Sequence, residues 1–305
     1  MIRLRNEQTE IVVGWFRRLI KRIVRNRIHV VVCAASATWA WAQLANTPLP
    51  ITNLVIVSLM MFCIYEWNRL FDMVEDQINS PSRAWHSQNS KAILIYGCIL
   101  SLVLCLMLVP LTGNPNALGI LILVVFLGVL YSTPLSLMPF GKISRLKNIP
   151  ILKNVTSGIG WSLLVVIYPA VHTAQPLTVK HGVAAALMFG SVWMVELIWD
   201  IRDQKGDRAA KVQTIPVLKG IKGAFDWIST LNVITGLGLL TAVVMGWVPE
   251  YWLIILTNNL LIYVWLPEEE IMFNRKWSHL LITIQTLLLV LIGVLASHIN
   301  WLKNI

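Results

Sequence analysis

Two clusters of acidic residues stand at the ends of apolar runs, and they carry the residue types that can do chemistry. The first extends from Asn68 to Asp76 and the second from Asp200 to Asp207. Carboxylate and amide oxygens suit Mg²⁺, which fills the rest of its octahedron with water and phosphate oxygens. Grouped carboxylates also repel one another unless a cation lies between them. We therefore expect the two clusters to face each other and to hold one magnesium-bound diphosphate.

Helical spacing places the acids of each cluster on one face. Asn68, Asp72 and Asp76 are spaced i, i+4 and i+8, which on a helix is an arc of about 80°, and Glu75 falls on the same face. In the second cluster the spacing is i, i+3 and i+7, an arc of about 60°. Its members are Asp200, Asp203 and Asp207. Each cluster is thus predicted to form a column of oxygen ligands.

The cost of acids in a membrane favours a functional site. An Asp at the centre of a lipid-facing helix costs roughly 2.5–3.5 kcal/mol on the insertion scale. The acids must therefore line a watery cavity or lie at the membrane surface. A solvated loop turn would explain either cluster alone, whereas two clusters at the same membrane face favour a binding site.

The elements that position these clusters follow from the composition. Of the 305 residues, 56% are hydrophobic and 13% are charged, whereas a soluble domain carries about 25% charged residues. The net charge of +10 does not indicate nucleic-acid binding, because the basic residues lie in short loops between apolar runs. The four cysteines lie inside these runs without metal-binding spacing. Trp247 and Trp252 are expected at the membrane interface.

Nine apolar runs predict an all-α polytopic membrane protein with one domain over residues 29–305. A basic amphipathic segment, residues 1–28, precedes it and is expected to lie on an anionic membrane surface. The runs lie near residues 29–46, 51–66, 91–110, 117–133, 150–170, 182–199, 224–246, 250–266 and 278–298.

The distribution of Lys and Arg predicts the orientation. With the N-terminus in the cytoplasm, every Lys and Arg except Lys180 and Lys303 lies in a cytoplasmic segment or at its flanking helix ends. This bias is a positive-inside signal. It places both acidic clusters on the cytoplasmic side.

The acidic segments resemble two motifs of the UbiA superfamily of intramembrane prenyltransferases. Residues 68–76 resemble its N-D-x-x-D-x-x-x-D motif, and residues 200–207 resemble its D-x-x-D-x-x-x-D motif. The segment 214–220, Thr-Ile-Pro-Val-Leu-Lys-Gly, is similar to the T-x-P-V-x-x-G that follows it. The resemblance implies a nine-helix bundle with a central cavity capped on the cytoplasmic side.

The resemblance also implies a Mg²⁺-dependent prenyltransferase, in which Asp72, Asp76, Asp200 and Asp203 are catalytic. It would move a polyprenyl group from its diphosphate to an aromatic or other lipophilic acceptor, as in lipoquinone-type biosynthesis. The protein would be embedded in membrane lipid, and we expect this membrane to be the prokaryotic cell (inner) membrane. We expect no nucleic-acid partner. The implied ligands of two Mg²⁺ ions are Asn68, Asp72 and Asp76 for one and Asp200, Asp203 and Asp207 for the other.

Arg69 departs from the motif, because many family members carry Asp at this position. Arg69 either contacts the diphosphate or pairs with Glu66 as a structural ion pair, and the sequence favours neither.

Basic and polar residues near the clusters are expected to bind the diphosphate. Lys153 and Asn154 are the best candidates, because a charged residue at the start of an apolar run is unfavourable unless it has a role there. For the other basic residues, setting the membrane orientation is an equally simple explanation. The full set of expected substrate-binding residues is Asn68, Arg69, Lys142, Arg145, Lys147, Lys153, Asn154, Arg202, Lys205, Tyr131 and either Arg22 or Arg25.

Other side chains near the clusters have two interpretations. Glu196, one turn before Asp200, is either a base that acts on the acceptor or a hydrogen-bonded structural acid. Aromatic side chains either shield a carbocation by cation–π contact or serve as packing and interfacial anchors. These aromatics are Tyr65, Trp67, Tyr131, Trp193 and Trp199.

Two rival functions remain open. A terpene cyclase of the same superfamily would ionise the prenyl diphosphate without an external acceptor. An ion transporter would line its path with the acids, but they gather at one membrane face and do not continue across the bilayer.

Overall fold

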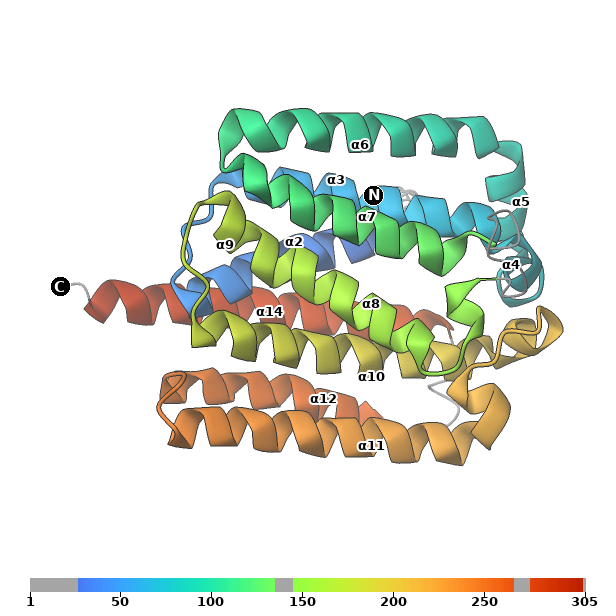
Figure 1. Cartoon of the computed structure of the whole chain (residues 1–305). Coiled ribbons are helices and arrows are strands. Elements are labelled where there is room, and N and C mark those ends of the chain that lie inside the picture. The colour runs from blue at the N-terminus through green and yellow to red at the C-terminus, as the bar shows by residue number, and fades with distance from the viewer. Residues whose placement is uncertain (1–26, 135–144, 266–274, 304–305) are drawn as a thin grey trace, which may run out of the picture.

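Helices form at each predicted apolar run in the computed structural model, which describes residues 27–134, 145–265 and 275–303 and contains no strand in them (Figure 1). The predicted amphipathic segment 1–28 therefore lies almost entirely outside the described residues. The long helices are α2 (Ile28–Ala45), α3 (Ile51–Phe71), α6 (Lys91–Thr112), α7 (Leu118–Ser132), α10 (Val179–Ala209), α11 (Ile215–Val244) and α14 (Arg275–Lys303).

Shorter elements complete the bundle. The fifth predicted run consists of α8 (Leu152–Ser162), a π-helical turn η4 (Leu163–Ile167) and α9 (Tyr168–His172). The others are α4 (Met73–Asn79), α5 (Pro81–Asn89), η1 (Pro115–Ala117), η3 (Leu146–Asn148), η5 (Glu250–Ile255) and α12 (Leu256–Trp265).

Eight helical spans within the described residues are long and apolar enough to cross a membrane. This confirms the all-α membrane fold but not the predicted number of nine spans. The eighth predicted run, 250–266, is divided between η5 and α12, and neither element has the length of a span.

Two helix boundaries differ from the sequence expectation near the second acidic cluster. α10 extends beyond the predicted apolar run, which ends near residue 199, and continues to Ala209, so the whole cluster is helical, as its spacing predicted. α11 begins at Ile215, with Pro216 in its first turn, where the missing N–H of proline costs nothing. Gly220 interrupts α11 with a φ of 74°, a backbone conformation that glycine adopts without steric cost.

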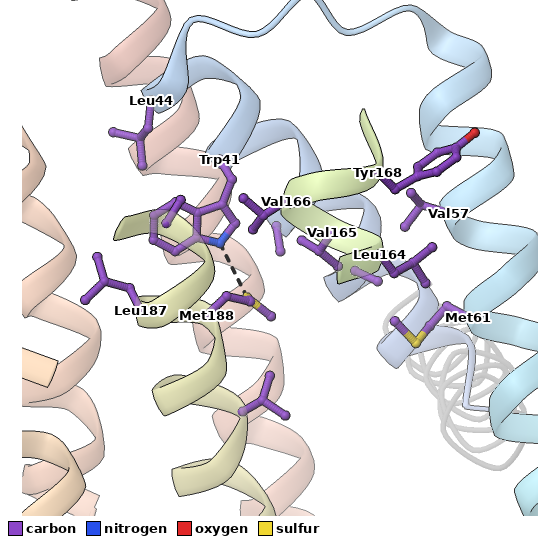
Figure 2. Packing of buried hydrophobic residues seen from close by; sticks show 14 of the residues in the cluster. Trp41, Leu44, Val57, Met61, Leu164, Val165, Val166, Tyr168, Leu187 and Met188 are labelled. Atoms are coloured by element: carbon purple, nitrogen blue, oxygen red, sulfur yellow. Dashed lines mark hydrogen bonds between the residues drawn. The ribbon is translucent and has the colours of Figure 1, made fainter. Parts of the chain in front are cut away.

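A core of interlocking side chains joins α2, α3, α9 and α10 (Figure 2). The indole N–H of Trp41 donates to the sulfur of Met188 over 3.4 Å. Trp252 is fully buried, with its ring centroid 6.0 Å from that of Trp41. The expectation that Trp252 lies at the membrane interface is therefore wrong. Because lipid is as apolar as these side chains, packing of this kind holds membrane helices together.

The helix ends that carry the acidic clusters meet at one end of the bundle. The C-terminal ends of α3 and α10 and the N-terminal end of α8 lie there, and α4 and α5 close it (Figure 1). α8 packs closely against α10, because a Cβ at Gly158 would lie 2.7 Å from the ring of Phe189. This packing sets the start of α8 beside the acids of α10.

Candidate active site

The first acidic segment bends at Asp72. α3 ends at Phe71, and Asp72, with φ −91° and ψ 15°, joins it to α4. The expectation that Asn68, Asp72 and Asp76 share one continuous helix is therefore wrong. The Asp76 N–H still donates to the Asp72 carbonyl over 2.8 Å, so the helical repeat is largely kept across the bend. The three side chains consequently line the same cavity.

Two neighbours fix the first ligand column. The Asn68 amide donates to Asp72 Oδ2 over 2.8 Å, and the Ser132 hydroxyl at the end of α7 donates to Asn68 Oδ1 over 3.1 Å. The amide is thereby oriented with its N–H toward the carboxylate.

Basic residues around η3 neutralise this column. Lys147 forms an ion pair with Asp72 and lies 3.0 Å from Glu75 Oε1. Arg145 donates to Glu75 Oε1 over 2.7 Å and to the Phe71 carbonyl over 2.9 Å, which satisfies an exposed carbonyl at the end of α3. Burial raises the pKa of Asp72, but Lys147 and Arg27 outweigh it and hold this pKa below its ordinary value. Asp72 is therefore ionised at neutral pH.

The second column lies on the last turns of α10 and is a continuous helix, as predicted. Asp200 is 3% exposed, and its Oδ1 lies 2.5 Å from the Lys153 ammonium in the first turn of α8. Asp203 accepts two hydrogen bonds from Arg202, of 3.0 Å from Nε and 2.5 Å from Nη2. Asp207, one turn further on, is also buried.

Asn79 at the end of α4 connects the two columns. Its amide donates to the Asp203 carbonyl over 3.0 Å, and its Oδ1 accepts from the Gly206 N–H over 3.0 Å. A Cβ at Gly206 would lie 2.2 Å from the Asn79 amide nitrogen, so glycine permits this approach. The bend at Asp72 carries α4 to this position.

Both columns line one polar cavity of about 910 Å³. Among the described residues, seven carboxyl groups and four Lys or Arg side chains line it. The site is thus rich in both signs of charge with an excess of acid. The carboxyl groups are Asp72, Glu75, Asp76, Glu196, Asp200, Asp203 and Asp207, and the cations are Arg27, Lys147, Lys153 and Arg202.

The oxygen set suits Mg²⁺ that arrives with phosphate. No three Asp, Glu, His or Cys side chains of the described residues converge closely enough to hold a metal ion by themselves. Mg²⁺ is commonly bound through only one or two carboxylates together with phosphate oxygens and water. In the described part of the chain, Asp207 Oδ2 and Glu75 Oε2 are buried without a hydrogen-bond partner. Buried oxygens of this kind are open to a cation.

Two largely apolar chambers adjoin the polar cavity. The α7–α8 chamber, of about 570 Å³, lies between α3, α7 and α8 and includes Met61, Leu127 and Leu164. The α14 chamber, of about 850 Å³, lies between α2, α10, α12 and α14. Tyr65 and Trp161 line both chambers, with ring centroids 6.4 Å apart and the rings nearly perpendicular. This aromatic pair forms part of the wall between them.

Glu196 borders all three spaces. It is 8% exposed and accepts hydrogen bonds from the Ser157 hydroxyl and, over 3.5 Å, from the Asn154 amide. The same Asn154 amide lies 3.5 Å from Asp200 Oδ2. Glu196 is therefore connected through one side chain to the second ligand column.

Comparison with known proteins identifies the family. The sequence profile of the UbiA prenyltransferase family matches residues 30–269. This chain belongs to the UbiA prenyltransferase family. It is accordingly an integral membrane protein of a transferase family. A comparison with curated protein sequences gives no match.

Solved UbiA structures share the fold at low sequence identity. A UbiA homolog from Archaeoglobus fulgidus bound to GPP and Mg²⁺ is 15% identical, with a TM-score of 0.68 over 90% of this chain and 99% of that one. The apo structure of a UbiA homolog from Aeropyrum pernix K1 is 14% identical, with a TM-score of 0.65 over 88% and 98%. A digeranylgeranylglyceryl phosphate synthase is 17% identical, with a TM-score of 0.59 over 92% and 99%.

Arg69 marks where this UbiA chain departs from the motif, and its contacts favour the structural ion pair. The side chain is 1% exposed, its Nη1 lies 3.1 Å from Glu66 Oε2, and its Nε donates to Ser87 Oγ over 2.6 Å. It forms the ion pair with Glu66 and does not line the polar cavity.

The other expected substrate-binding residues of this UbiA chain divide into three groups. The cavity-lining residues of this set are Asn68, Tyr131, Lys147, Lys153 and Arg202, whereas Lys205 is exposed and does not line the cavity. Asn154 lies behind the cavity with bonds to Asp200 and Glu196. Arg145 supports the first column from outside the cavity lining. Lys142, Arg22 and Arg25 lie outside the described residues.

The expected aromatic residues fall into two groups. Tyr65, Tyr131 and Trp199 line the polar cavity. Trp67 instead donates to Thr133, and Trp193 stacks on Trp227 in the core. Packing therefore explains the last two.

Arg27 was missed by the sequence interpretation, which pointed to Arg22 or Arg25. It lines the polar cavity and lies 5.4 Å from the centroid of the Tyr65 ring. Burial lowers the pKa of Arg27, but Asp76 and Asp72 outweigh it and raise this pKa overall, so Arg27 stays charged. The sequence feature that could have indicated Arg27 is its position as the last basic residue before the first apolar run.

Proposed function

We propose that this chain is a Mg²⁺-dependent prenyltransferase that moves a polyprenyl group from its diphosphate to an aromatic or other lipophilic acceptor. The observation that carries the proposal is the polar cavity, in which two carboxylate columns face each other with Lys and Arg between them. The solved UbiA homolog bound to GPP and Mg²⁺ supports it.

The charges of the cavity complement a metal-bound diphosphate. Because carboxyl groups outnumber cations by seven to four among the described lining residues, the site would repel a bare diphosphate. Mg²⁺ reverses this balance. The carboxylates Asp72 and Asp76, with Asn68, would hold one ion, and Asp200, Asp203 and Asp207 a second. When bound, Mg²⁺ would stabilise negative charge that develops on the departing diphosphate.

Lys153, Lys147, Arg27 and Arg202 would bind the phosphate oxygens. In the structure Lys153 and Lys147 contact Asp200 and Asp72. A diphosphate between the columns would receive these ammonium groups while the carboxylates turn to the metal. Fixed donors directed at developing charge act strongly in a site that excludes water.

Apolar and aromatic walls would complete the site. The prenyl tail would occupy the α7–α8 chamber, whose lining is largely apolar and includes aliphatic side chains such as Met61, Leu127 and Leu164. The faces of Tyr65, Tyr131 and Trp199 would attract the positive charge that develops on the allylic carbon. The positive-inside bias supports a cytoplasmic location for this end of the bundle, in a prokaryotic cell membrane.

The test is release of labelled diphosphate by the purified protein, with a prenyl diphosphate, Mg²⁺ and a set of acceptors. We expect Mg²⁺-dependent release, reduced at least a hundredfold in Asp200→Asn. Asp226→Asn on the exposed side of α11 is the matched control and is expected to behave as wild type. Equal release by wild type and Asp200→Asn would refute the proposal. Release without any acceptor, with a cyclised hydrocarbon or alcohol as product, would show a terpene cyclase instead.

A further inference from the structure

The α14 chamber contains a string of polar side chains contributed by three helices. Gln285 of α14 donates from its amide to Asn258 Oδ1 over 3.1 Å, and the Asn258 amide of α12 lies 3.5 Å from Ser191 Oγ of α10. All three side chains line the chamber. The remaining lining is dominated by aliphatic and aromatic side chains such as Leu288 and Trp41.

The simplest explanation of such a string is adhesion between helices, because Asn and Gln form hydrogen bonds across membrane helices. The neighbouring Asn259 shows what adhesion looks like in this chain. Asn259 and Asn232 of α11 each donate to the other's backbone carbonyl, over 3.2 Å and 2.8 Å, and Asn259 also donates to Thr235. Neither lines a chamber.

Asn258 and Gln285 differ from this pair, because their amides bond to side chains and border open space. Each primary amide has two N–H donors and a carbonyl acceptor. The bonds of the string use one N–H of each. Further donors and acceptors thus remain for a ligand, and polar groups that line an intramembrane cavity often mark a substrate path.

The charge around this chamber defines which ligand suits it. Among the described residues no Lys or Arg lines the α14 chamber, and its one carboxyl group is Glu196 at the border with the polar cavity. An anionic ligand would lose its hydration without gaining a partner. A neutral ligand with hydroxyl or carbonyl oxygens could form hydrogen bonds with the amide and hydroxyl groups of the chamber without the desolvation penalty of a charge.

On the basis of the proposed prenyl transfer, we propose that the α14 chamber is the acceptor site and that Ser191, Asn258 and Gln285 bind a neutral acceptor by its hydroxyl or carbonyl oxygens. Glu196 stands where this chamber meets the polar cavity and the α7–α8 chamber. The acceptor would therefore meet the allylic carbon beside Glu196, with the prenyl tail on the other side of the Tyr65–Trp161 wall.

The first experiment measures acceptor binding without catalysis. The probes are the methyl ester of a dihydroxynaphthoate and the corresponding free acid, titrated calorimetrically into detergent-purified protein without Mg²⁺ or diphosphate. We expect the neutral ester to bind at least tenfold more tightly than the acid. Asn258→Leu and Ser191→Ala are each expected to weaken ester binding about tenfold, the scale of one hydrogen bond. Asn259→Leu is the control and is expected to keep ester binding in the protein that remains folded.

The second experiment separates this inference from the proposed function. In steady-state transfer, Asn258→Leu is expected to raise the acceptor KM about tenfold and to leave the KM of the prenyl diphosphate unchanged. Equal binding of acid and ester, or unchanged ester binding in both variants, would overturn the acceptor site even if prenyl transfer occurs. Tight, Asn258-dependent ester binding would support the acceptor site even if diphosphate release failed its own test.

Discussion

The ammonium of Lys153 lies 2.5 Å from Asp200 Oδ1, so the first turn of α8 is joined to the last turns of α10 by an ion pair at the edge of the polar cavity. Both side chains are largely buried, at 15% and 4% exposure. In the proposed function Asp200 would bind the metal ion and Lys153 would bind the diphosphate. The pair therefore leads directly to a substitution experiment.

Lys153→Met is expected to raise the KM for prenyl diphosphate roughly 10- to 150-fold, because a hydrogen bond to a charged group is worth about 1.5–3 kcal/mol. The measurement is initial-rate kinetics at saturating Mg²⁺ and acceptor. Lys222→Met, on the exposed surface of α11, is the matched control. An unchanged KM in Lys153→Met would show that this lysine serves folding alone.

The position of Lys153 at the polar cavity shows what local sequence can reveal. A lysine at the start of an apolar run is costly, and the run predicted the helix on which it lies. The second column could also be predicted from the local sequence, because Asp200, Asp203 and Asp207 lie on one helix and their spacing alone places them on one face. The apolar runs themselves predicted the spans, since each must satisfy its backbone within the bilayer.

The bend at Asp72 and the contacts of Asn79 were not predictable in this way. The segment after Asn68 has no Pro or Gly to indicate a break, and the bend depends on contacts with residues far along the chain, such as Lys147 and Arg145. Arg27 was missed for the same reason, because its role follows from how the start of α2 packs beside Tyr65. Contacts between distant helices determine these positions.

Asn79→Ala is expected to increase the Mg²⁺ concentration needed for half-maximal activity about tenfold. The substitution removes both hydrogen bonds that hold α4 against α10, so the two ligand columns lose their fixed separation. Mg²⁺ titration of transfer activity is the measurement, and a fall in kcat with an unchanged Mg²⁺ requirement would contradict this positioning role.

Gly206→Ala tests the same contact from the other helix. The new Cβ would lie 2.2 Å from the Asn79 amide nitrogen, so we expect a similar Mg²⁺ defect. In the double variant with Asn79→Ala the clash disappears, and the two effects are expected not to add. Gly182→Ala, on the same helix with no atom near its new Cβ, is the control for the effect of alanine itself.

Arg69→Met is expected to destabilise the protein by about 3–5 kcal/mol, because it removes the cation that lies 3.1 Å from the buried Glu66 carboxylate. Thermal unfolding in detergent would show the loss. The KM for prenyl diphosphate is expected to remain within twofold of wild type in the folded fraction. Adding Glu66→Gln is expected to restore part of the stability, since it removes the buried charge that Arg69 neutralises. A large rise in KM with wild-type stability would instead indicate that Arg69 binds the diphosphate.

Removal of metal is expected to abolish transfer and to be fully reversible. The carboxylates keep Lys147 and Lys153 as partners without metal, so the fold should survive a chelator with little change in Tm. Mg²⁺ together with inorganic diphosphate is expected to raise Tm more than either alone, because ligands that bind the folded state stabilise it by mass action. A chelator-induced loss of helix by circular dichroism would contradict this account.

Gln285→Lys reverses the charge preference proposed for the α14 chamber. The new ammonium would face a chamber whose described lining has no other cation, and the free-acid acceptor would become its natural partner. We expect acid binding to increase at least tenfold and ester binding to fall, measured by the same calorimetric titration. An ion pair is stronger in a low-dielectric site than at a surface. Tighter binding of the free acid by the variant is therefore the diagnostic result. If the acid still failed to bind while the variant remained folded, as judged by its Tm, the acceptor would not lie against Gln285, and the polar string would be adhesion between α10, α12 and α14.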